Sequence, residues 1–74
     1  MSIAEVSPSV RSRTEAEERL IEAAADMLGE VGPRAMTVRG VAERAEVNHG
    51  LVHHYFGGKE GLAEAAMLHL VQQH

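Results

Sequence analysis

The chain has 74 residues, a net charge of -4 and no cysteine, so it provides one small domain and excludes disulfides and thiol chemistry. No apolar run approaches the ~20 residues that a membrane-spanning helix needs, and residues 1–10 show no secretory signal. We therefore expect a cytoplasmic protein with no membrane contact.

The acidic residues are concentrated in the first half of the chain. Residues 1–33 carry seven acids and three arginines, whereas residues 34–74 carry four acids, four basic side chains and all five histidines. The net charge alone disfavours a nucleic-acid partner. Its distribution, however, leaves the central stretch neutral, and positive where the histidines are protonated.

Residues 1–13 are predicted to form a flexible N-terminal arm, because their serines and proline show no periodicity. Arg11 and Arg13, near its end, allow two interpretations. They are either solvated charges of a tail or, as in homeodomain arms, side chains that lie along DNA or in its minor groove. Residues 14–74 are predicted to form one helical domain.

A long amphipathic helix is predicted to begin at Thr14, which is followed three residues later by Glu17 in a capping-box pattern. Apolar residues then recur at helical spacing, on the stripe Leu20, Ile21, Ala24, Leu28 and Val31. Gly32 is placed to end this helix, and Pro33 prevents its continuation. In the connector that follows, Met36 is expected to fill the core.

The first of two short helices is predicted at about residues 38–45, with Thr37 as its N-cap. Its apolar face carries residues at helical spacing, namely Val38, Val41, Ala42 and Ala45. Gly40 weakens this helix but leaves room for another helix to cross closely.

The second short helix is predicted at about residues 49–56, with Asn48 as its N-cap and Val47 filling the turn. Its inward side carries three large residues, Val52, Tyr55 and Phe56. The two rings are predicted to be the centre of the core, because aromatic side chains bury the most area. Helices this short pack at a steep angle, which is typical of a helix-turn-helix.

The outward face of the second short helix has three imidazoles and no acid. Its residues are His49, Gly50, Leu51, His53 and His54. Imidazoles donate to phosphates and base edges, a glycine admits a close backbone, and a leucine can meet a thymine methyl group. This face is therefore predicted to contact a nucleic acid.

A fourth helix is predicted to begin near Lys59, after the break at Gly57-Gly58. Its main stripe carries Leu62, Ala65, Ala66, His69 and Leu70, while other faces carry Met67, Leu68 and Val71. Its last two turns are apolar nearly all round, so we expect another structure to cover them.

These elements together resemble the DNA-binding domain of the tetracycline-repressor (TetR) family of transcriptional regulators. The resemblance rests on Thr37-Val-Arg-Gly-Val-Ala-Glu-Arg-Ala, on Val47, and on His54-Tyr-Phe-Gly-Gly-Lys59 with Leu62, and it extends over residues 14–70. It implies an all-α fold, in which a three-helix helix-turn-helix DNA-binding head is followed by the start of a fourth helix. The fourth helix is expected to be truncated, because the family's larger ligand-binding and dimerisation domain is absent from this chain.

The resemblance also implies a function and its partners. A bacterial transcriptional regulator of this kind binds double-stranded DNA, and is expected to be a repressor released by a small-molecule effector on the missing domain. A full-length homodimer would bind a near-palindromic operator, whereas this fragment is expected to be monomeric. No enzymatic activity, cofactor or metal is implied.

The implied DNA contacts come from the two short helices and the start of the fourth. Thr37 and Lys59 would hold phosphates, the latter with help from helix N-terminal amides, and Arg39 would reach the backbone or a guanine edge. The full set of implied contacts is Thr37, Val38, Arg39, Asn48, His49, Gly50, Leu51, His53, His54, Tyr55 and Lys59.

Three positions depart from the family pattern. Glu46 replaces the glycine that is usual in the turn, which predicts either left-handed strain or a different turn, and places there a carboxylate that could repel DNA. Gly61 replaces a good helix former and is expected to weaken the first turn of the fourth helix. His53 replaces tyrosine, so a phosphate contact there would depend on pH.

The alternative function is a small helical protein-interaction module without DNA binding, which the negative charge and the apolar fourth helix support. A resident metal held by His49 and His53 is disfavoured, because nearby residues do not complete a ligand set. No Ser–His–acid order supports catalysis.

Overall fold

The structure is a computed structural model that describes residues 14–72. This part of the chain consists of the helices α3 (Glu15–Ala35), α4 (Val38–Ala45), α5 (Gly50–Phe56) and α6 (Lys59–Gln72). The predicted all-α fold is therefore confirmed over these residues. The predicted arm, residues 1–13, and the alternatives for its arginines lie outside them.

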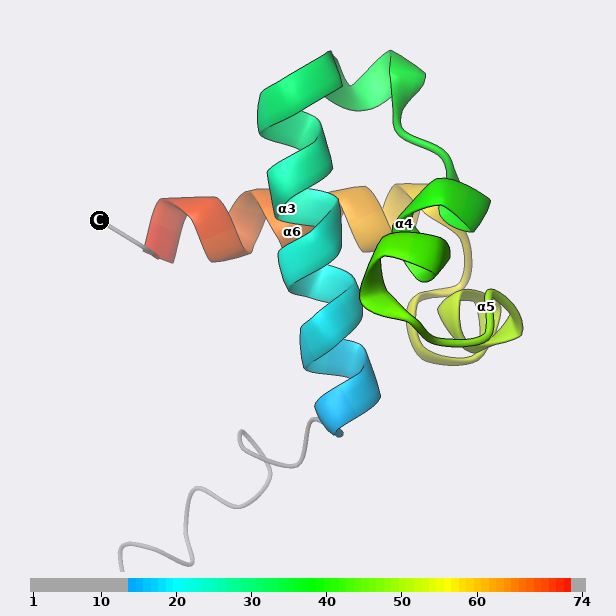
Figure 1. The fold of residues 1–74 in the computed structure, drawn as a ribbon. Coiled ribbons are helices and arrows are strands. Elements are labelled where there is room, and N and C mark those ends of the chain that lie inside the picture. The colour runs from blue at the N-terminus through cyan, green and yellow to red at the C-terminus, as the bar shows by residue number, and fades with distance from the viewer. Residues whose placement is uncertain (1–13, 73–74) are drawn as a thin grey trace, which may run out of the picture.

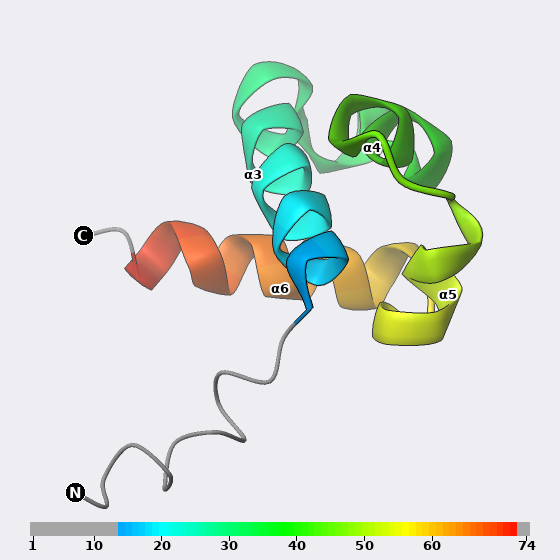
Figure 2. The same ribbon diagram turned by 60° about the horizontal axis from the view of Figure 1, so that its bottom comes forward.

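The helices are arranged around a crossing of the two longest ones. α3 crosses α6 steeply, and α4 and α5 lie together on one side of α3 (Figure 1). The C-terminal end of α6 projects past α3 on the opposite side (Figure 2). α3 packs against each of the other three helices, and α5 packs mainly against α6.

Both ends of α3 follow from local chemistry. Thr14 Oγ1 accepts from the Glu17 N–H at 3.1 Å, and Glu17 Oε1 accepts from the Thr14 N–H at 2.8 Å, so the predicted capping box is confirmed. At the other end Gly32 has a φ of 84°, which interrupts the helix before one further turn that contains Pro33. Met36 then turns inward and is fully buried, as predicted.

The first turn of α4 lies close to α3. Thr37 Oγ1 caps α4 by accepting from the Gly40 N–H at 3.0 Å. A Cβ added at Gly40 would lie 2.8 Å from Thr37 Oγ1 and 3.3 Å from Cε of Met27, which belongs to α3. The absence of a side chain at Gly40 therefore permits the close crossing that the sequence predicted.

The core is aliphatic. Its largest fully buried side chains come from all four helices and the connector, and are Leu20, Met36, Val41, Val52 and Leu62. The prediction that Tyr55 and Phe56 form the centre is wrong, because both are only half-buried. The space enclosed by α3, α4 and α6 is filled by aliphatic groups, and the Phe56 ring packs at its edge.

The last two turns of α6 expose apolar side chains, as predicted. Met67, Leu68, Leu70 and Val71 are between 40% and 68% exposed. No helix in the range 14–72 is long and apolar enough to cross a bilayer.

Candidate nucleic-acid interface

The turn between α4 and α5 begins at Glu46, which has φ 62° and ψ 43° and is thus left-handed. The Glu46 N–H donates to the Glu43 carbonyl at 3.1 Å, and the Val47 N–H donates to the Ala42 carbonyl at 3.0 Å, so the last carbonyls of α4 are satisfied. Val47 then packs against the core. The sequence allowed either a left-handed residue or a different turn, and the structure shows the left-handed residue.

Asn48 was predicted to be the N-cap of α5, but the N-cap is His49, which makes no side-chain cap hydrogen bond. Asn48 precedes His49 and bonds to the first turn of the helix. Its Oδ1 accepts from the Gly50 N–H at 2.7 Å, and its carbonyl accepts from the Leu51 N–H at 3.0 Å. The helix itself begins at Gly50, although His49 already has helical angles. Because the bond to Gly50 uses Oδ1, the Nδ2 amide of Asn48 remains able to donate to a ligand.

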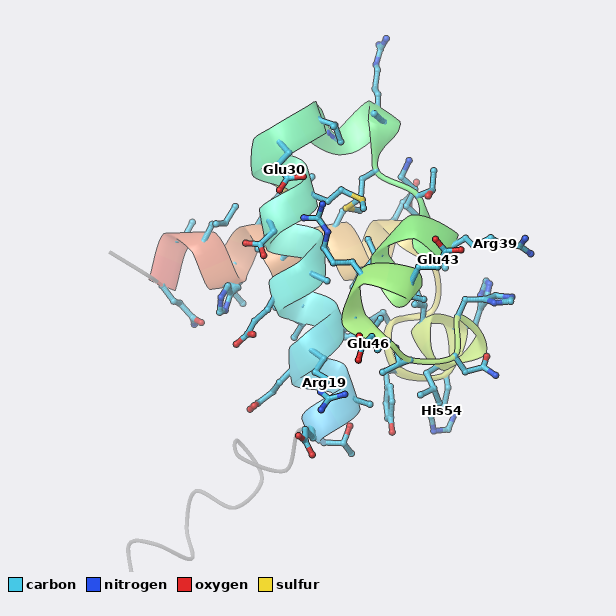
Figure 3. All side chains as sticks on the ribbon, in the orientation of Figure 1. Arg19, Glu30, Arg39, Glu43, Glu46 and His54 are labelled. Atoms are coloured by element: carbon cyan, nitrogen blue, oxygen red, sulfur yellow. The ribbon has the colours of Figure 1, made fainter. Side chains whose placement is uncertain are left out.

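The outward face of α5 agrees with the prediction at four of its five positions. His49, Gly50, His53 and His54 are exposed, and His54 points outward in Figure 3. Leu51 differs, because it is half-buried and packs against the core. α5 is short and packs against both α3 and α6, so its buried arc includes part of Leu51 beside Val52.

Three neighbouring rings contact one another in the last turn of α5. The rings of His54 and Tyr55 meet edge to face with their centroids 4.9 Å apart, and those of Tyr55 and Phe56 are 6.4 Å apart. Tyr55 is half-buried, so its side chain is only partly accessible to a ligand.

α4 contributes exposed polar groups at its N-terminal end. Thr37 and Arg39 are exposed, and Arg39 points away from α3 (Figure 3). Val38 is half-buried and packs against the core, so it offers less surface than the exposed residues beside it.

A shallow recess lies between α4 and the start of α5. Its lining consists of Arg39, Ala42, Glu43, Val47, Asn48 and His49. The recess brings together a predicted contact from α4 and two from the α4–α5 junction. The recess also contains Glu43, which the sequence did not predict at this site. Glu43 follows Arg39 by four residues on the same helix, and this spacing indicates that the two side chains are neighbours on one face.

Lys59 is the exposed first residue of α6, and two glycines place it there. Gly57 and Gly58 have φ values of 80° and 136°, which side chains rarely adopt. The Leu62 N–H donates to the Gly58 carbonyl at 3.1 Å, which starts the helix. Lys59 thus stands beside the N-terminal amides of a 14-residue helix, an arrangement that favours an anion.

The sequence of the region just described matches a known family. The family described as "Bacterial regulatory proteins, tetR family" matches residues 20–66, which include α4, α5 and most of α3 and α6. The chain belongs to the TetR family. Its all-α helix-turn-helix fold is that of the family's N-terminal part.

Curated relatives that are named as HTH-type transcriptional regulators agree with this assignment. The chain is 43% identical over 58 residues to the HTH-type transcriptional repressor Rv3405c of Mycobacterium tuberculosis, a match that covers 78% of this chain and 31% of that protein. It is 40% identical over 65 residues to the HTH-type transcriptional regulator BetI of Burkholderia cenocepacia, covering 88% and 34% respectively. The chain thus spans about a third of the length of these relatives. No solved structure matches it.

Two of the three departures from the TetR pattern have a structural reading. Glu46 lies on the α3 side of the turn, apart from Arg39 (Figure 3), in a recess that Arg19 and Arg44 also line. At Gly61 an added Cβ would lie 1.9 Å from the Phe56 carbonyl oxygen. The glycine therefore allows α6 to begin against the end of α5, a reason that helix propensity alone does not reveal.

An ion pair between α3 and α4 was also missed by the sequence reasoning. Arg44 donates from Nη1 and Nη2 to the two carboxylate oxygens of Glu30, at 3.0 and 2.8 Å. This hydrogen bonding lowers the pKa of Glu30 and raises that of Arg44. The two residues are 14 positions apart on different helices, so neither periodicity nor spacing indicates their pairing.

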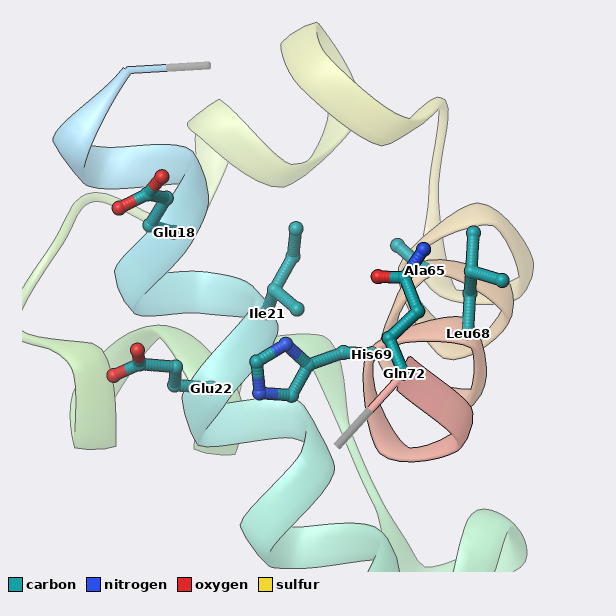
Figure 4. A pocket seen from close by; sticks show the side chains of 7 residues that line it. All are labelled: Glu18, Ile21, Glu22, Ala65, Leu68, His69 and Gln72. Atoms are coloured by element: carbon teal, nitrogen blue, oxygen red, sulfur yellow. The ribbon is translucent and has the colours of Figure 1, made fainter. Parts of the chain in front are cut away.

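A second groove lies between α3 and α6. The groove is lined by Glu18, Ile21 and Glu22 on α3 and by Ala65, Leu68, His69 and Gln72 on α6, and the His69 ring reaches from α6 toward α3 (Figure 4). None of the predicted DNA contacts lines this groove. Among residues 14–72, no three His, Asp or Glu side chains come together as metal ligands.

Proposed function

We propose that this chain is the head of a transcriptional regulator that binds double-stranded DNA sequence-specifically. The observation that carries the proposal is the recess that Arg39 of α4 lines together with Asn48 and His49. Arg39 is a cation with a planar donor fork, the Asn48 amide nitrogen is not used in the bond to Gly50, and His49 is exposed. A base edge in the major groove offers acceptors to such a set.

In this proposal α5 enters the major groove with its outward face. His49, Gly50, His53 and His54 contact bases and phosphates, while Leu51, Val38 and the Tyr55 hydroxyl contribute through their accessible parts. Thr37 and Lys59 hold phosphates on either side, since each lies at the N-terminal end of a helix. Arg39 contacts the backbone or a guanine edge.

The proposal extends to a longer protein, because this chain spans about a third of the length of its curated relatives. Such a protein would act in the cytoplasm as a homodimer on a near-palindromic operator, without enzymatic activity. It would be a repressor, as one relative is named, and a small-molecule effector bound outside this chain would release it from DNA.

The test is a selection from randomised duplexes with this domain fused to a dimeriser, because joining two heads raises avidity by about 10²–10⁴. We expect a near-palindromic consensus. Binding of the selected duplex should weaken steeply as salt rises, since phosphate contacts release counterions. No enrichment, together with no duplex binding even at ~50 mM salt, would refute the proposal.

The alternative, a helical protein-interaction module, is favoured by one observation. Met67, Leu68 and Val71 on the last turns of α6 are each more than half exposed, which is unusual for large apolar side chains in so small a domain. This alternative predicts that a protein partner is retained and that duplexes are not.

A further inference from the structure

The only side-chain hydrogen bonds that join two helices within residues 14–72 are those between Glu30 and Arg44. α4 also packs against α3, and its buried side chains Val41, Ala42 and Ala45 belong to the apolar core. Apolar packing is non-directional, whereas a guanidinium that donates two parallel bonds to one carboxylate fixes an orientation. The pair therefore constrains the rotation of α4 about its own axis.

The rotation of α4 matters for the proposed interface. Arg39 and Arg44 are five residues apart, which separates them by about 140° around an α-helix. Arg44 is held by Glu30 on the α3 side, and Arg39 points away from α3 (Figure 3). Turning α4 so that Arg44 leaves Glu30 would also displace Arg39 and the N-terminal end of the helix at Thr37.

Within residues 14–72, α4 has little direct contact with α5 that could replace this constraint. α4 packs mainly on α3, and α5 packs mainly on α6. The two helices that contribute the proposed DNA contacts are thus positioned through different partners. Their relative orientation depends on how each of them is held.

We propose that the Glu30–Arg44 pair is a tether that positions α4 for DNA binding, and that neither residue contacts DNA. The inference rests on the proposed function. Losing the tether lets α4 adopt orientations that do not bind, and the apparent dissociation constant rises as the competent fraction falls. Because both side chains are exposed, the ion pair contributes only a small interaction free energy. Its loss is therefore expected to raise the apparent dissociation constant by about 1.5-fold to 5-fold.

For Glu30→Gln, the change of charge and the loss of the tether predict opposite changes in DNA affinity. Glu30→Gln removes a negative charge, which by itself favours DNA binding, yet the tether predicts weaker binding. Glu18→Gln is the matched control, because it makes the same change of charge at an exposed position of α3 whose side chain has no hydrogen-bond partner among residues 14–72. We expect Glu30→Gln and Arg44→Gln to weaken binding of the selected duplex by about 1.5- to 5-fold relative to Glu18→Gln.

A charge swap separates positioning from direct contact. In the double variant Glu30→Arg with Arg44→Glu, the tether is rebuilt with reversed polarity, and we expect affinity to return to within experimental error of the parent. Dissociation constants are measured by fluorescence anisotropy at ~150 mM salt, well below the lowest melting temperature of the set, so that loss of folded protein does not enter.

The affinities of Glu30→Gln and of the charge swap can each refute the tether. If Glu30→Gln binds as tightly as Glu18→Gln or more tightly, or if the swap fails to restore affinity, the tether is refuted. Weak binding by Arg44→Gln combined with tight binding by Glu30→Gln would instead assign Arg44 a direct phosphate contact. If the unsubstituted domain binds no duplex at all, the proposed function fails, and this outcome is distinct from failure of the tether.

Discussion

Gly61→Ala should destabilise this domain even though alanine is the better helix former. An alanine Cβ at this position would lie 1.9 Å from the Phe56 carbonyl oxygen and 3.0 Å from its carbon. Both neighbours are backbone atoms, so relief requires α6 to move away from the end of α5. Overpacking of this kind costs about 1–3 kcal/mol, whereas the gain in helix propensity is at most about 1 kcal/mol, so the overlap dominates.

The matched control is Gly29→Ala. Gly29 is exposed on α3, and a Cβ there would meet no atom within 4 Å. The same chemical change should therefore raise stability by roughly 0.5–1 kcal/mol. The two variants thus differ in the predicted sign of their effect.

Thermal and urea unfolding, followed by circular dichroism, measure both effects. In a domain of this size each kcal/mol shifts Tm by about 4–8 °C, so the two variants should unfold on opposite sides of the parent. Gly61→Ala should also weaken DNA binding for all sequences alike, since moving the start of α6 displaces Lys59. A Gly61→Ala protein that unfolds at or above the parent temperature would show that α6 does not begin against the Phe56 carbonyl.

Three further predictions follow from the interface and its supports. Lys59→Ala should weaken binding of all duplexes about equally, and Arg39→Ala should also relax the sequence preference by about 1–3 kcal/mol at one base pair; a selection repeated with each variant measures this, and two unchanged consensus profiles with unchanged affinities would contradict the assignment. Glu46→Gly should raise the free energy of unfolding by about 1 kcal/mol, because glycine adopts the left-handed backbone conformation of this position without steric strain. Urea unfolding measures this change, and a lower urea midpoint would show that Glu46 is not strained. The Glu30–Arg44 pair should stabilise the fold above the ordinary Glu pKa and lose this contribution as pH falls through the lowered folded-state pKa of Glu30. The difference in stability between the parent and Glu30→Gln should therefore shrink below about pH 4.5, and a difference that stays constant from pH 7 to pH 3 would refute the linkage.

Local chemistry made much of this fold predictable. The Thr14–Glu17 capping box and the Thr37 cap each depend on residues within three positions of one another. The breaks at Gly32 and at Gly57-Gly58 likewise depend on backbone conformations that the glycines themselves permit.

Features that depend on packing between helices were harder to predict. Tyr55 and Phe56 were expected at the centre because of their size, but the enclosed space is filled by aliphatic groups from other helices. Leu51 was expected to be outward, yet its burial depends on how α5 sits against α3 and α6. The Glu30–Arg44 pair joins helices whose relative placement no local pattern indicates.

The types of residue at the candidate interface were evident from the sequence, but their grouping was not. Exposed imidazoles on α5 and an exposed cation on α4 follow from the inward stripes of those helices. That Arg39 and its helix neighbour Glu43 share one recess with Asn48 and His49 depends on how the chain folds back after α4.

The shortness of α5 has a consequence for its dynamics. The helix has seven residues, of which only Val52 is fully buried, and its first turn is closed by bonds between residues three apart. An isolated helix of this length is unstable in water, so α5 relies on its neighbours for its conformation. Its amide protons should therefore exchange with solvent sooner than those of the buried middle of α3, through brief local opening. A duplex that accepted this helix would suppress the opening, and part of the binding free energy would be spent on ordering it.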